Sequence, residues 1–186
     1  MSGTLPIADA LQSANVCIFV EGFFAMHFKT HRFHKIHSKI AVFQRYLREC
    51  DFGRYNHWII SGIWKELRKL KCGFTLGAST IRYRRSLELG NRVHLQSKIL
   101  YWDEKAFYVE QRLINEDNFV CATVIAKQSV ISPKGQESVT PQSILEALFR
   151  KPVRAPEPPP ELESWLKYNI ASSDRLKDER NKFHYQ

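Results

Sequence analysis

The chain has few of the residues that would indicate a disulfide-rich or membrane-spanning protein. It contains only four cysteines in 186 residues, and none of them forms a Cys-x-x-Cys pair. That spacing excludes a dense disulfide framework and favours a reducing compartment. No apolar run is long and clean enough to cross a bilayer, since the nearest candidate, Val16 to Phe28, contains Glu21 and His27. The first residues hold no Lys or Arg, so we do not expect a secretory signal.

Acidic residues are outnumbered, because 28 Lys and Arg stand against 19 Asp and Glu and give a net charge of +9. This bias suits an anionic partner such as nucleic acid, a membrane surface or a phosphorylated cofactor, and a solvated basic face explains it equally well. No nucleic-acid-binding motif accompanies the charge. The basic, histidine-rich run from His27 to His37 has Lys and Arg between its histidines. These cations oppose a metal ion, so we expect neither a metal nor another cofactor.

One stretch, residues 43–51, organises the rest of the chain. Its apolar side chains fall at helical spacing. They are Phe43, Tyr46, Leu47 and Cys50. A helix with one apolar stripe must bury that stripe against another element. Four strand-like segments follow downstream, so we expect a sheet that wraps this helix.

Glycines are predicted to bound the next helix. Gly53 is expected to end the organising helix, and a second helix is predicted over Arg54–Lys71, with Gly73 near its C-cap. From Phe74 the apolar period changes to two, which predicts strands, the last of them over Phe119–Ser132. The turns between the strands are Gly90-Asn91, Asp103–Lys105 and Asn115–Asn118. Short turns predict an antiparallel meander, and long strands suit a curved sheet.

Helices and a proline-rich segment are expected after the sheet. Thr140-Pro141 predicts the N-cap and first position of a short helix that ends at Phe149. Pro152–Pro160 predicts an extended strap. A last helix is expected over Glu161–Tyr168, followed by a charged tail that frays from Arg175 onwards.

Short segments between Gln44 and Asp174 carry the most specific signal. They are Tyr46–Asp51, Leu76–Ser79, Tyr83–Ser86, Tyr101–Asp103, Ala106–Glu110, Phe119–Ala122, Pro159–Leu162, Trp165, Tyr168-Asn169 and Ala171–Ser173. In this order they resemble the thioesterase superfamily member six family. The resemblance implies an α+β hotdog fold, in which a curved antiparallel sheet wraps a central helix. It also implies a homodimer related to acyl-CoA thioesterases of lipid metabolism.

The catalytic motif of that family is not matched. In the family, the residues directly before the counterpart of Gln44 read Asp-x-x-x-His-Met-Asn-Asn, whereas here residues 36–43 read IHSKIAVF. The Asp, His and two Asn positions are taken by Ile36, Ile40, Val42 and Phe43. Thioester hydrolysis needs a carboxylate that activates water or attacks the carbonyl. The resemblance therefore implies binding of acyl-CoA or a related acyl thioester with weak or absent hydrolysis.

Candidate site residues come from the same resemblance. His37, next to the aspartate position, and Glu49, on the helix, are candidates for a relocated catalytic group, although an exposed ion pair with Arg45 explains Glu49 more simply. The expected acyl pocket is lined by Phe43, Tyr46, Leu47, Ser79 and Tyr83. The phosphates of CoA would meet Arg82, Arg84 and Arg85. Ordinary core packing and a solvated sheet face explain these two groups as well.

Three regions are expected: an atypical segment over 1–42, a hotdog core over 43–135, and C-terminal helices with the proline-rich strap over 136–186. The sharp onset of the family pattern at Gln44 suggests that the first region comes from an alternative exon or a mis-joined gene model. Abundant RNA-sequencing reads across the Phe43–Gln44 junction would contradict that hypothesis. Members of the family often carry an N-terminal membrane or secretory segment, so membrane association follows from the resemblance alone.

Two other functions remain open at this point. One is a non-enzymatic, membrane- or lipid-associated scaffold that uses the dimer and the tail. The other is an active thioesterase with relocated catalytic groups. Binding of an acyl-CoA analogue without turnover, turnover, and no binding at all distinguish the three hypotheses.

Overall fold

The computed structural model describes residues 18–19, 37–87, 93–134 and 138–183, with side chains excluded for 18–19 and 37–45. The histidine-rich run therefore lies outside the described residues, apart from the backbone of His37. The chain divides into two compact units, the second of which begins at Pro156. Within the described ranges, no helix is both long enough and apolar enough to span a membrane.

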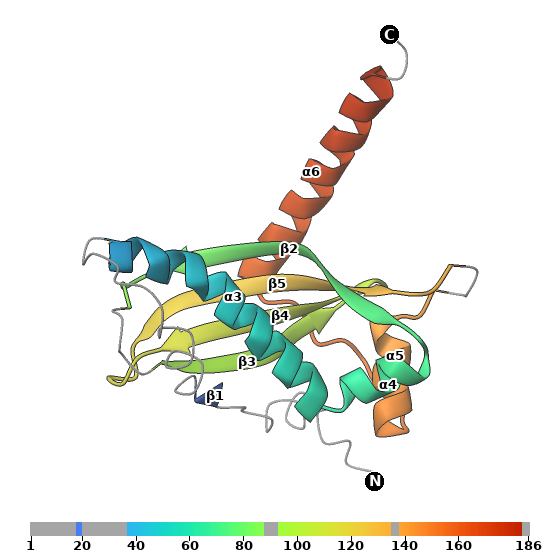
Figure 1. Ribbon diagram of the computed structural model, residues 1–186. Helices are drawn as coiled ribbons and strands as arrows, with labels where there is room; N and C mark the ends of the chain where they lie inside the picture. Colours follow the sequence, from blue (N-terminus) through green and yellow to red (C-terminus); the bar gives the residue numbers. More distant parts are fainter. Residues whose placement is uncertain (1–17, 20–36, 88–92, 135–137, 184–186) are drawn as a thin grey trace. The chain divides into compact units, whose positions relative to one another are not determined.

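Five antiparallel strands form one sheet in the order β1-β3-β4-β5-β2 (Figure 1). They are β1 (Ile18–Phe19), β2 (Gly73–Tyr83), β3 (His94–Trp102), β4 (Ala106–Ile114) and β5 (Val120–Ile131). The expected hairpins from β3 to β4 and from β4 to β5 are confirmed. The predicted meander is wrong for the first of its strands, because β2 pairs with β5 and not with β3. Residues 84–93 connect β2 to β3, and a connection of this length can pass the two intervening strands.

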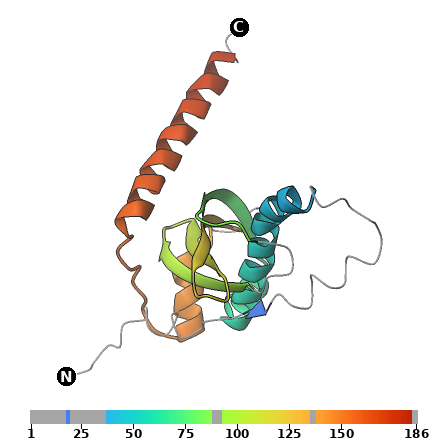
Figure 2. The ribbon, with the colours of Figure 1, turned by 90° about the vertical axis from the view of Figure 1, so that its left-hand side faces the viewer.

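Helix α3 (His37–Ile60) crosses one face of the curved sheet (Figures 1 and 2). The prediction that Gly53 ends this helix is wrong. A Cβ at Gly53 would collide with Cδ2 of Leu95 and would lie 3.1 Å from Nε2 of Gln111. The glycine therefore lets the helix approach the sheet closely without interrupting it. The helix stops instead before Gly62, whose φ of 81° is in the left-handed region.

The second predicted helix is shorter than expected, since α4 covers only Ile63–Lys69. Gly73 is not its C-cap but the first residue of β2. The left-handed residue in this connection is Lys71, with a φ of 54°. The predicted Arg54–Lys71 helix is thus the end of α3, a glycine turn and one short helix.

Two hydrophobic clusters fill the first compact unit. The cluster around Tyr46 contains Tyr46, Cys50, Leu87, Leu95, Leu113, Cys121, Ala122 and Val124. The cluster around Trp58 contains Trp58, Ile63, Leu67, Cys72, Ile99, Trp102, Phe107, Val109, Ile144, Leu145 and Val153. We call them the Tyr46 cluster and the Trp58 cluster. Each takes side chains from α3, β3 and β4, so both lie where the helix meets the sheet.

The helices after the sheet follow the predicted caps. In α5 (Pro141–Phe149), the hydroxyl of Thr140 accepts a hydrogen bond of 3.1 Å from the backbone N–H of Ser143, which confirms the N-cap. In the second unit, α6 (Pro160–Phe183) continues well beyond the predicted end at Tyr168. An ion pair of 2.9 Å between Lys177 and Asp174, three residues apart, supports this extension.

Candidate functional site

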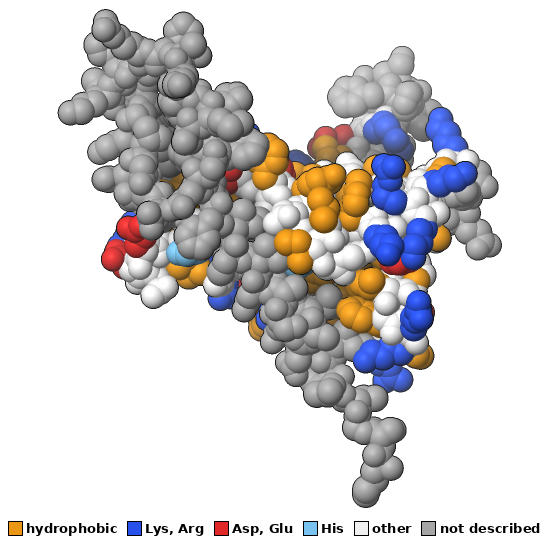
Figure 3. Space-filling model, turned by 60° about the horizontal axis from the view of Figure 1, so that its bottom comes forward, with side chains coloured by type: hydrophobic (Ala, Val, Ile, Leu, Met, Phe, Trp, Pro, Cys, Tyr) orange, Lys and Arg blue, Asp and Glu red, His pale blue; other side chains and the backbone are white. Residues whose placement is uncertain are grey.

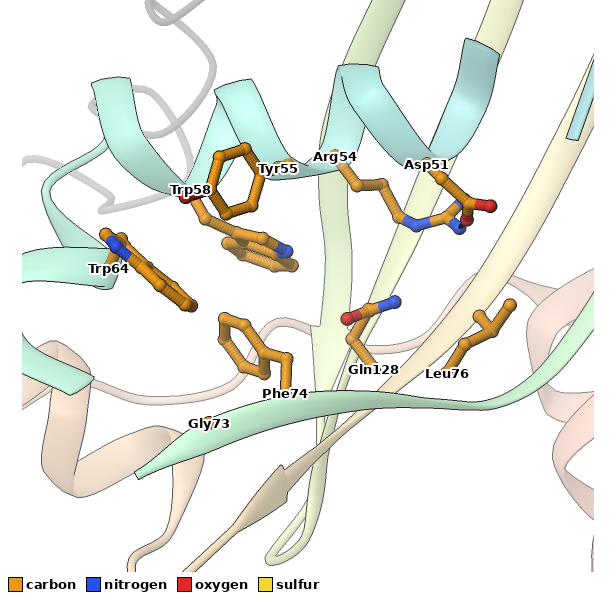
Figure 4. A pocket seen from close by; sticks show the side chains of 9 residues that line it. All are labelled: Asp51, Arg54, Tyr55, Trp58, Trp64, Gly73, Phe74, Leu76 and Gln128. Atoms are coloured by element: carbon orange, nitrogen blue, oxygen red, sulfur yellow. Dashed lines mark hydrogen bonds and ion pairs between the residues drawn. The ribbon is translucent and has the colours of Figure 1, made fainter. Parts of the chain in front are cut away.

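A pocket of about 350 Å³ opens between α3, α4 and the first part of β2 (Figure 4). Its lining residues are Asp51, Arg54, Tyr55, Trp58, Trp64, Gly73, Phe74, Leu76 and Gln128. Aromatic rings form most of its inner wall. The ring centroids of Trp58 and Phe74 are 4.7 Å apart, and those of Tyr55 and Trp64 are 5.3 Å apart. The pocket therefore suits an apolar group with a few polar contacts.

The charged groups of the pocket are Asp51 and Arg54, which form an ion pair one helical turn apart. The Asp51 side chain is 57% exposed, whereas that of Arg54 is only 3% exposed. Burial lowers the pKa of Arg54, and the carboxylate of Asp51 acts in the opposite direction. The guanidinium stays charged, since its ordinary pKa is far above neutrality.

A buried polar layer continues from Arg54 into the sheet. Nη1 of Arg54 donates a hydrogen bond of 2.6 Å to Oε1 of Gln111. Nε2 of Gln111 donates to the backbone carbonyl of Cys50 at 2.9 Å and to the hydroxyl of Ser97 at 3.1 Å. These residues lie between members of the two clusters along α3, β3 and β4. We call Arg54, Gln111 and Ser97 the polar layer, and it separates the Tyr46 cluster from the Trp58 cluster.

Several buried side-chain nitrogens have no hydrogen-bond partner in the described part of the chain. Among the described residues they are Nε of Arg54, Nε1 of Trp58, Nε1 of Trp102 and both ring nitrogens of His57. Burial lowers the pKa of His57 to about 4, so its ring is neutral at neutral pH. Unpaired buried polar groups are rare in proteins, and each one calls for an explanation.

The residues expected to line an acyl pocket lie elsewhere. Tyr46 is buried in the Tyr46 cluster, where its hydroxyl accepts a hydrogen bond of 3.0 Å from the backbone N–H of Leu87. Its ring meets that of Tyr83 edge to face at 5.5 Å. Leu47 is 38% exposed and Ser79 is exposed on β2. The side chain of Phe43 lies outside the described residues. None of the described four lines the pocket of Figure 4.

The candidate catalytic residues are not brought together with the pocket either. His37 is the first residue of α3, and its side chain is outside the described residues. Glu49 forms an ion pair of 3.0 Å with Arg48. The expected partner of Glu49, Arg45, has no described side chain. A group of at least three His, Cys, Asp or Glu side chains placed to hold a metal does not occur in the described ranges.

The expected phosphate-binding arginines gather at the end of β2. Arg82, Arg84 and Arg85 are all exposed. The guanidinium carbons of Arg84 and Arg85 lie 4.7 and 4.1 Å from the centre of the Phe119 ring. Nη1 of Arg84 also donates to the carbonyl of Val120 at 3.3 Å. Stacking on one ring keeps these two positive charges close together.

A second basic area lies on another part of the surface. Figure 3 shows Lys and Arg side chains gathered on the right-hand side of one face, beside a patch of exposed hydrophobic side chains. Figure 1 places α4 and α5 on that side. Among the described side chains, Arg54 in the polar layer is the only Lys or Arg that is buried.

Sequence reasoning missed all nine residues of the pocket. Asp51, Arg54, Tyr55 and Trp58 are spaced as i, i+3, i+4 and i+7, which places them on one face of a continuous helix. The expected break at Gly53 hid this spacing. The residues from β2 and β5 gave no signal in the sequence, because they meet only through the pairing of two distant strands.

Comparison with known proteins gives a consistent result. The family model described as thioesterase-like superfamily matches residues 40–166. Protein THEM6 of Danio rerio is 43% identical over 136 residues, which are 73% of this chain and 64% of that protein. Protein THEM6 of Drosophila melanogaster is 36% identical over 139 residues, which are 73% of this chain and 67% of that protein. The chain thus spans about two thirds of the length of these relatives.

Among solved structures, the probable thioesterase YbaW from Escherichia coli is similar to this chain. It has a TM-score of 0.53 and 18% identity, and the likeness covers 74% of this chain and 96% of that protein. At this identity the likeness concerns the fold alone. Together with the strand order and the crossing helix, it confirms the expected α+β hotdog fold.

Proposed function

Because this chain belongs to the thioesterase-like superfamily, we propose that it binds an acyl thioester such as acyl-CoA and hydrolyses it slowly or not at all. The acyl group enters the pocket between α3 and β2. The observation that carries this proposal is the aromatic pocket itself, which lies between the central helix and the edge of the sheet. Its volume is at the small end of the range for ligand sites.

The walls of the pocket support an acyl ligand. Trp58, Phe74 and Phe107 form an aromatic cluster, in which the ring centroid of Phe107 is 5.4 Å from that of Trp58 and 5.9 Å from that of Phe74, the latter pair meeting edge to face. Such a wall is anchored in the core and changes little on binding. At the opening, Leu76 is 44% exposed and offers apolar surface that a ligand would remove from water.

The arginines at the end of β2 support a phosphate-bearing carrier. Leu76 at the pocket and Arg82 are six residues apart on one strand, which corresponds to about 20 Å. Opposite Gln128, Leu76 is on the sheet face towards α3, whereas Arg82, opposite Thr123, is on the other face. The span therefore suits an extended pantetheine arm with its thioester at the pocket and its phosphates at Arg84 and Arg85, beyond the end of the strand. Arginine pairs with phosphate through two parallel hydrogen bonds, so these residues fit this role.

Two features support slow or absent hydrolysis. The family motif is replaced by apolar residues at the start of α3, and the pocket is lined by a single carboxylate, that of Asp51. Arg54 pairs with that carboxylate and compensates its charge. A group engaged in this way is poorly placed to activate water for attack on a thioester.

We also propose that two copies associate, as the family resemblance implies. Strand β2 is at one edge of the sheet, and an edge strand presents unpaired backbone groups that a second copy can use. The exposed side chain of Tyr83 on this strand would be covered in such a dimer. Light scattering coupled to size exclusion tests this directly, and a monomer at high concentration would contradict it.

Calorimetric titration with a non-hydrolysable thioether analogue of acyl-CoA tests the binding, with thioester cleavage measured in parallel. We expect binding without turnover above that of buffer. Leu76→Arg should weaken binding at least tenfold, because it places a charge at an apolar opening. The matched control is Leu70→Arg, at an exposed leucine just after α4 that does not line the pocket, which should leave the affinity unchanged.

Other outcomes select the other hypotheses. Rapid turnover that disappears in Asp51→Asn or Glu49→Gln would indicate an active thioesterase with relocated catalytic groups. No binding of any acyl-CoA analogue would favour the non-enzymatic scaffold. Equal weakening by Leu76→Arg and Leu70→Arg would show that the acyl group binds outside this pocket.

A further inference from the structure

Two buried N–H groups face the pocket without an acceptor from the described part of the protein. They are Nε of Arg54 and Nε1 of Trp58, and each residue is only 2% exposed. The two residues are four positions apart on α3 and both line the pocket. Figure 4 shows the indole nitrogen of Trp58 and the guanidinium of Arg54 on either side of the space above Gln128.

The position of the Arg54 guanidinium is fixed by its other two nitrogens. Nη1 donates to Gln111 and Nη2 pairs with Asp51. Nε is the guanidinium nitrogen that has no acceptor among the described residues, and it cannot turn away without breaking these contacts. Asp51 already compensates the positive charge, so the free donor suits a neutral oxygen better than a second carboxylate.

Gln128 adds a third polar group to the same space. It projects from β5 into the pocket and is 8% exposed. Its amide both donates and accepts hydrogen bonds. The pocket therefore combines aromatic walls with a small polar region made of two donors and one amide. A hydrocarbon chain packs against the aromatic walls but gives the two donors and the amide no hydrogen-bond partner.

Building on the proposed acyl-thioester binding, we propose that the pocket selects acyl groups that carry a keto or hydroxyl oxygen. That oxygen accepts a hydrogen bond from Nε1–H of Trp58, and Nε–H of Arg54 is the second donor of the polar region. A plain hydrocarbon acyl group of the same length leaves both donors buried and unpaired, which weakens its binding. The polar region is thus a specificity determinant that adds to the apolar walls.

Trp102 provides a matched comparison within the protein. Its Nε1 is also buried and has no acceptor among the described residues, and it belongs to the Trp58 cluster. Trp102 does not line the pocket. A ligand in the pocket therefore gives the indole N–H of Trp58 an acceptor, whereas the indole N–H of Trp102 stays without one.

Titration calorimetry with thioether CoA analogues of equal chain length tests the proposal. One analogue is unsubstituted, and the others carry a single keto oxygen at successive positions. We expect one keto analogue to bind the full chain about tenfold more tightly than the hydrocarbon. Trp58→Phe keeps an aromatic ring but removes the N–H, and should reduce this preference to about twofold or less. Trp102→Phe should retain the full preference.

A second measurement does not depend on a variant. In a ¹⁵N-labelled sample, the indole N–H resonance of Trp58 should shift downfield with the keto analogue and not with the hydrocarbon, while that of Trp102 stays in place. Equal affinities for all analogues, or equal loss of preference in both tryptophan variants, would overturn this inference and leave the proposed acyl-CoA binding intact. Failure of every analogue to bind would overturn both.

Discussion

The Tyr46 cluster and the Trp58 cluster both lie between α3 and the sheet, but their polar atoms have different environments. In the Tyr46 cluster the tyrosine hydroxyl accepts from the backbone of Leu87. Burial raises the pKa of Cys50 to about 12, against the effect of nearby Arg54, so this thiol is neutral. In and beside the Trp58 cluster, two indoles and the His57 ring have no acceptor from the described residues.

From this difference we infer that the Tyr46 cluster is a structural core and that the Trp58 cluster borders a ligand site. A cluster whose polar atoms are satisfied needs nothing further, whereas unpaired donors beside an aromatic pocket lower stability until a ligand pairs them. Local violations of packing rules are expected at functional sites. We therefore propose that the Tyr46 cluster stabilises the fold and that the ligand binds beside the Trp58 cluster.

The polar layer is the boundary between the clusters, and breaking it should have the largest effect. Gln111→Leu removes the acceptor of Arg54 and leaves a buried guanidinium with one partner fewer. We expect a loss of about 3 to 4 kcal/mol in the free energy of unfolding, measured by urea denaturation. The same change at half-buried Gln96, on neighbouring β3, is the control and should cost much less. Equal effects at the two sites would contradict the role of the layer.

Low pH should lower the free energy of unfolding, because His57 beside the Trp58 cluster takes up a proton. Its folded-state pKa of about 4 is below the ordinary 6.5, so the unfolded chain takes up the proton first as the pH falls. The contribution of neutral His57 is therefore complete above about pH 7 and is lost between pH 6.5 and 4, a change of about 3 kcal/mol. His57→Leu should show a flatter dependence of unfolding free energy on pH over this window. Parallel curves for the two proteins would rule this out.

The smallest effect is expected in the Tyr46 cluster. Tyr46→Phe removes the hydroxyl that accepts from the backbone of Leu87 and should cost about 1 kcal/mol of unfolding free energy. Tyr55→Phe, at a half-exposed ring, is the control and should change stability very little. Binding of the acyl-CoA analogue should be the same in Tyr46→Phe as in the unchanged protein. A loss of binding in Tyr46→Phe would move the site towards the Tyr46 cluster.

Most of the fold could be predicted from the sequence. The alternating residues in β3, β4 and β5, the turns between them and the cap at Thr140 all depend on near neighbours, and all are confirmed. The burial of Cys50 and Cys121 among apolar neighbours followed in the same way. The family resemblance supplied the hotdog arrangement, which short-range patterns cannot specify.

The errors have a common physical cause. Gly53 is a helix breaker by its local preference, but a close contact with Leu95 on the sheet requires a residue without a side chain there. Strand β2 was expected beside β3 because they follow one another in sequence. The partner of β2 is β5, and only the closure of the sheet around α3 selects it.

The sequence by itself determined the family and the strands, because these are properties of consecutive residues. Only the tertiary structure decided where the pocket lies. It brings one face of α3 together with β2 and β5, and it buries Arg54 and Trp58 so that each retains an unpaired donor. Such a site depends on contacts between residues far apart in the chain and on the exclusion of water, and neither is written in local spacing.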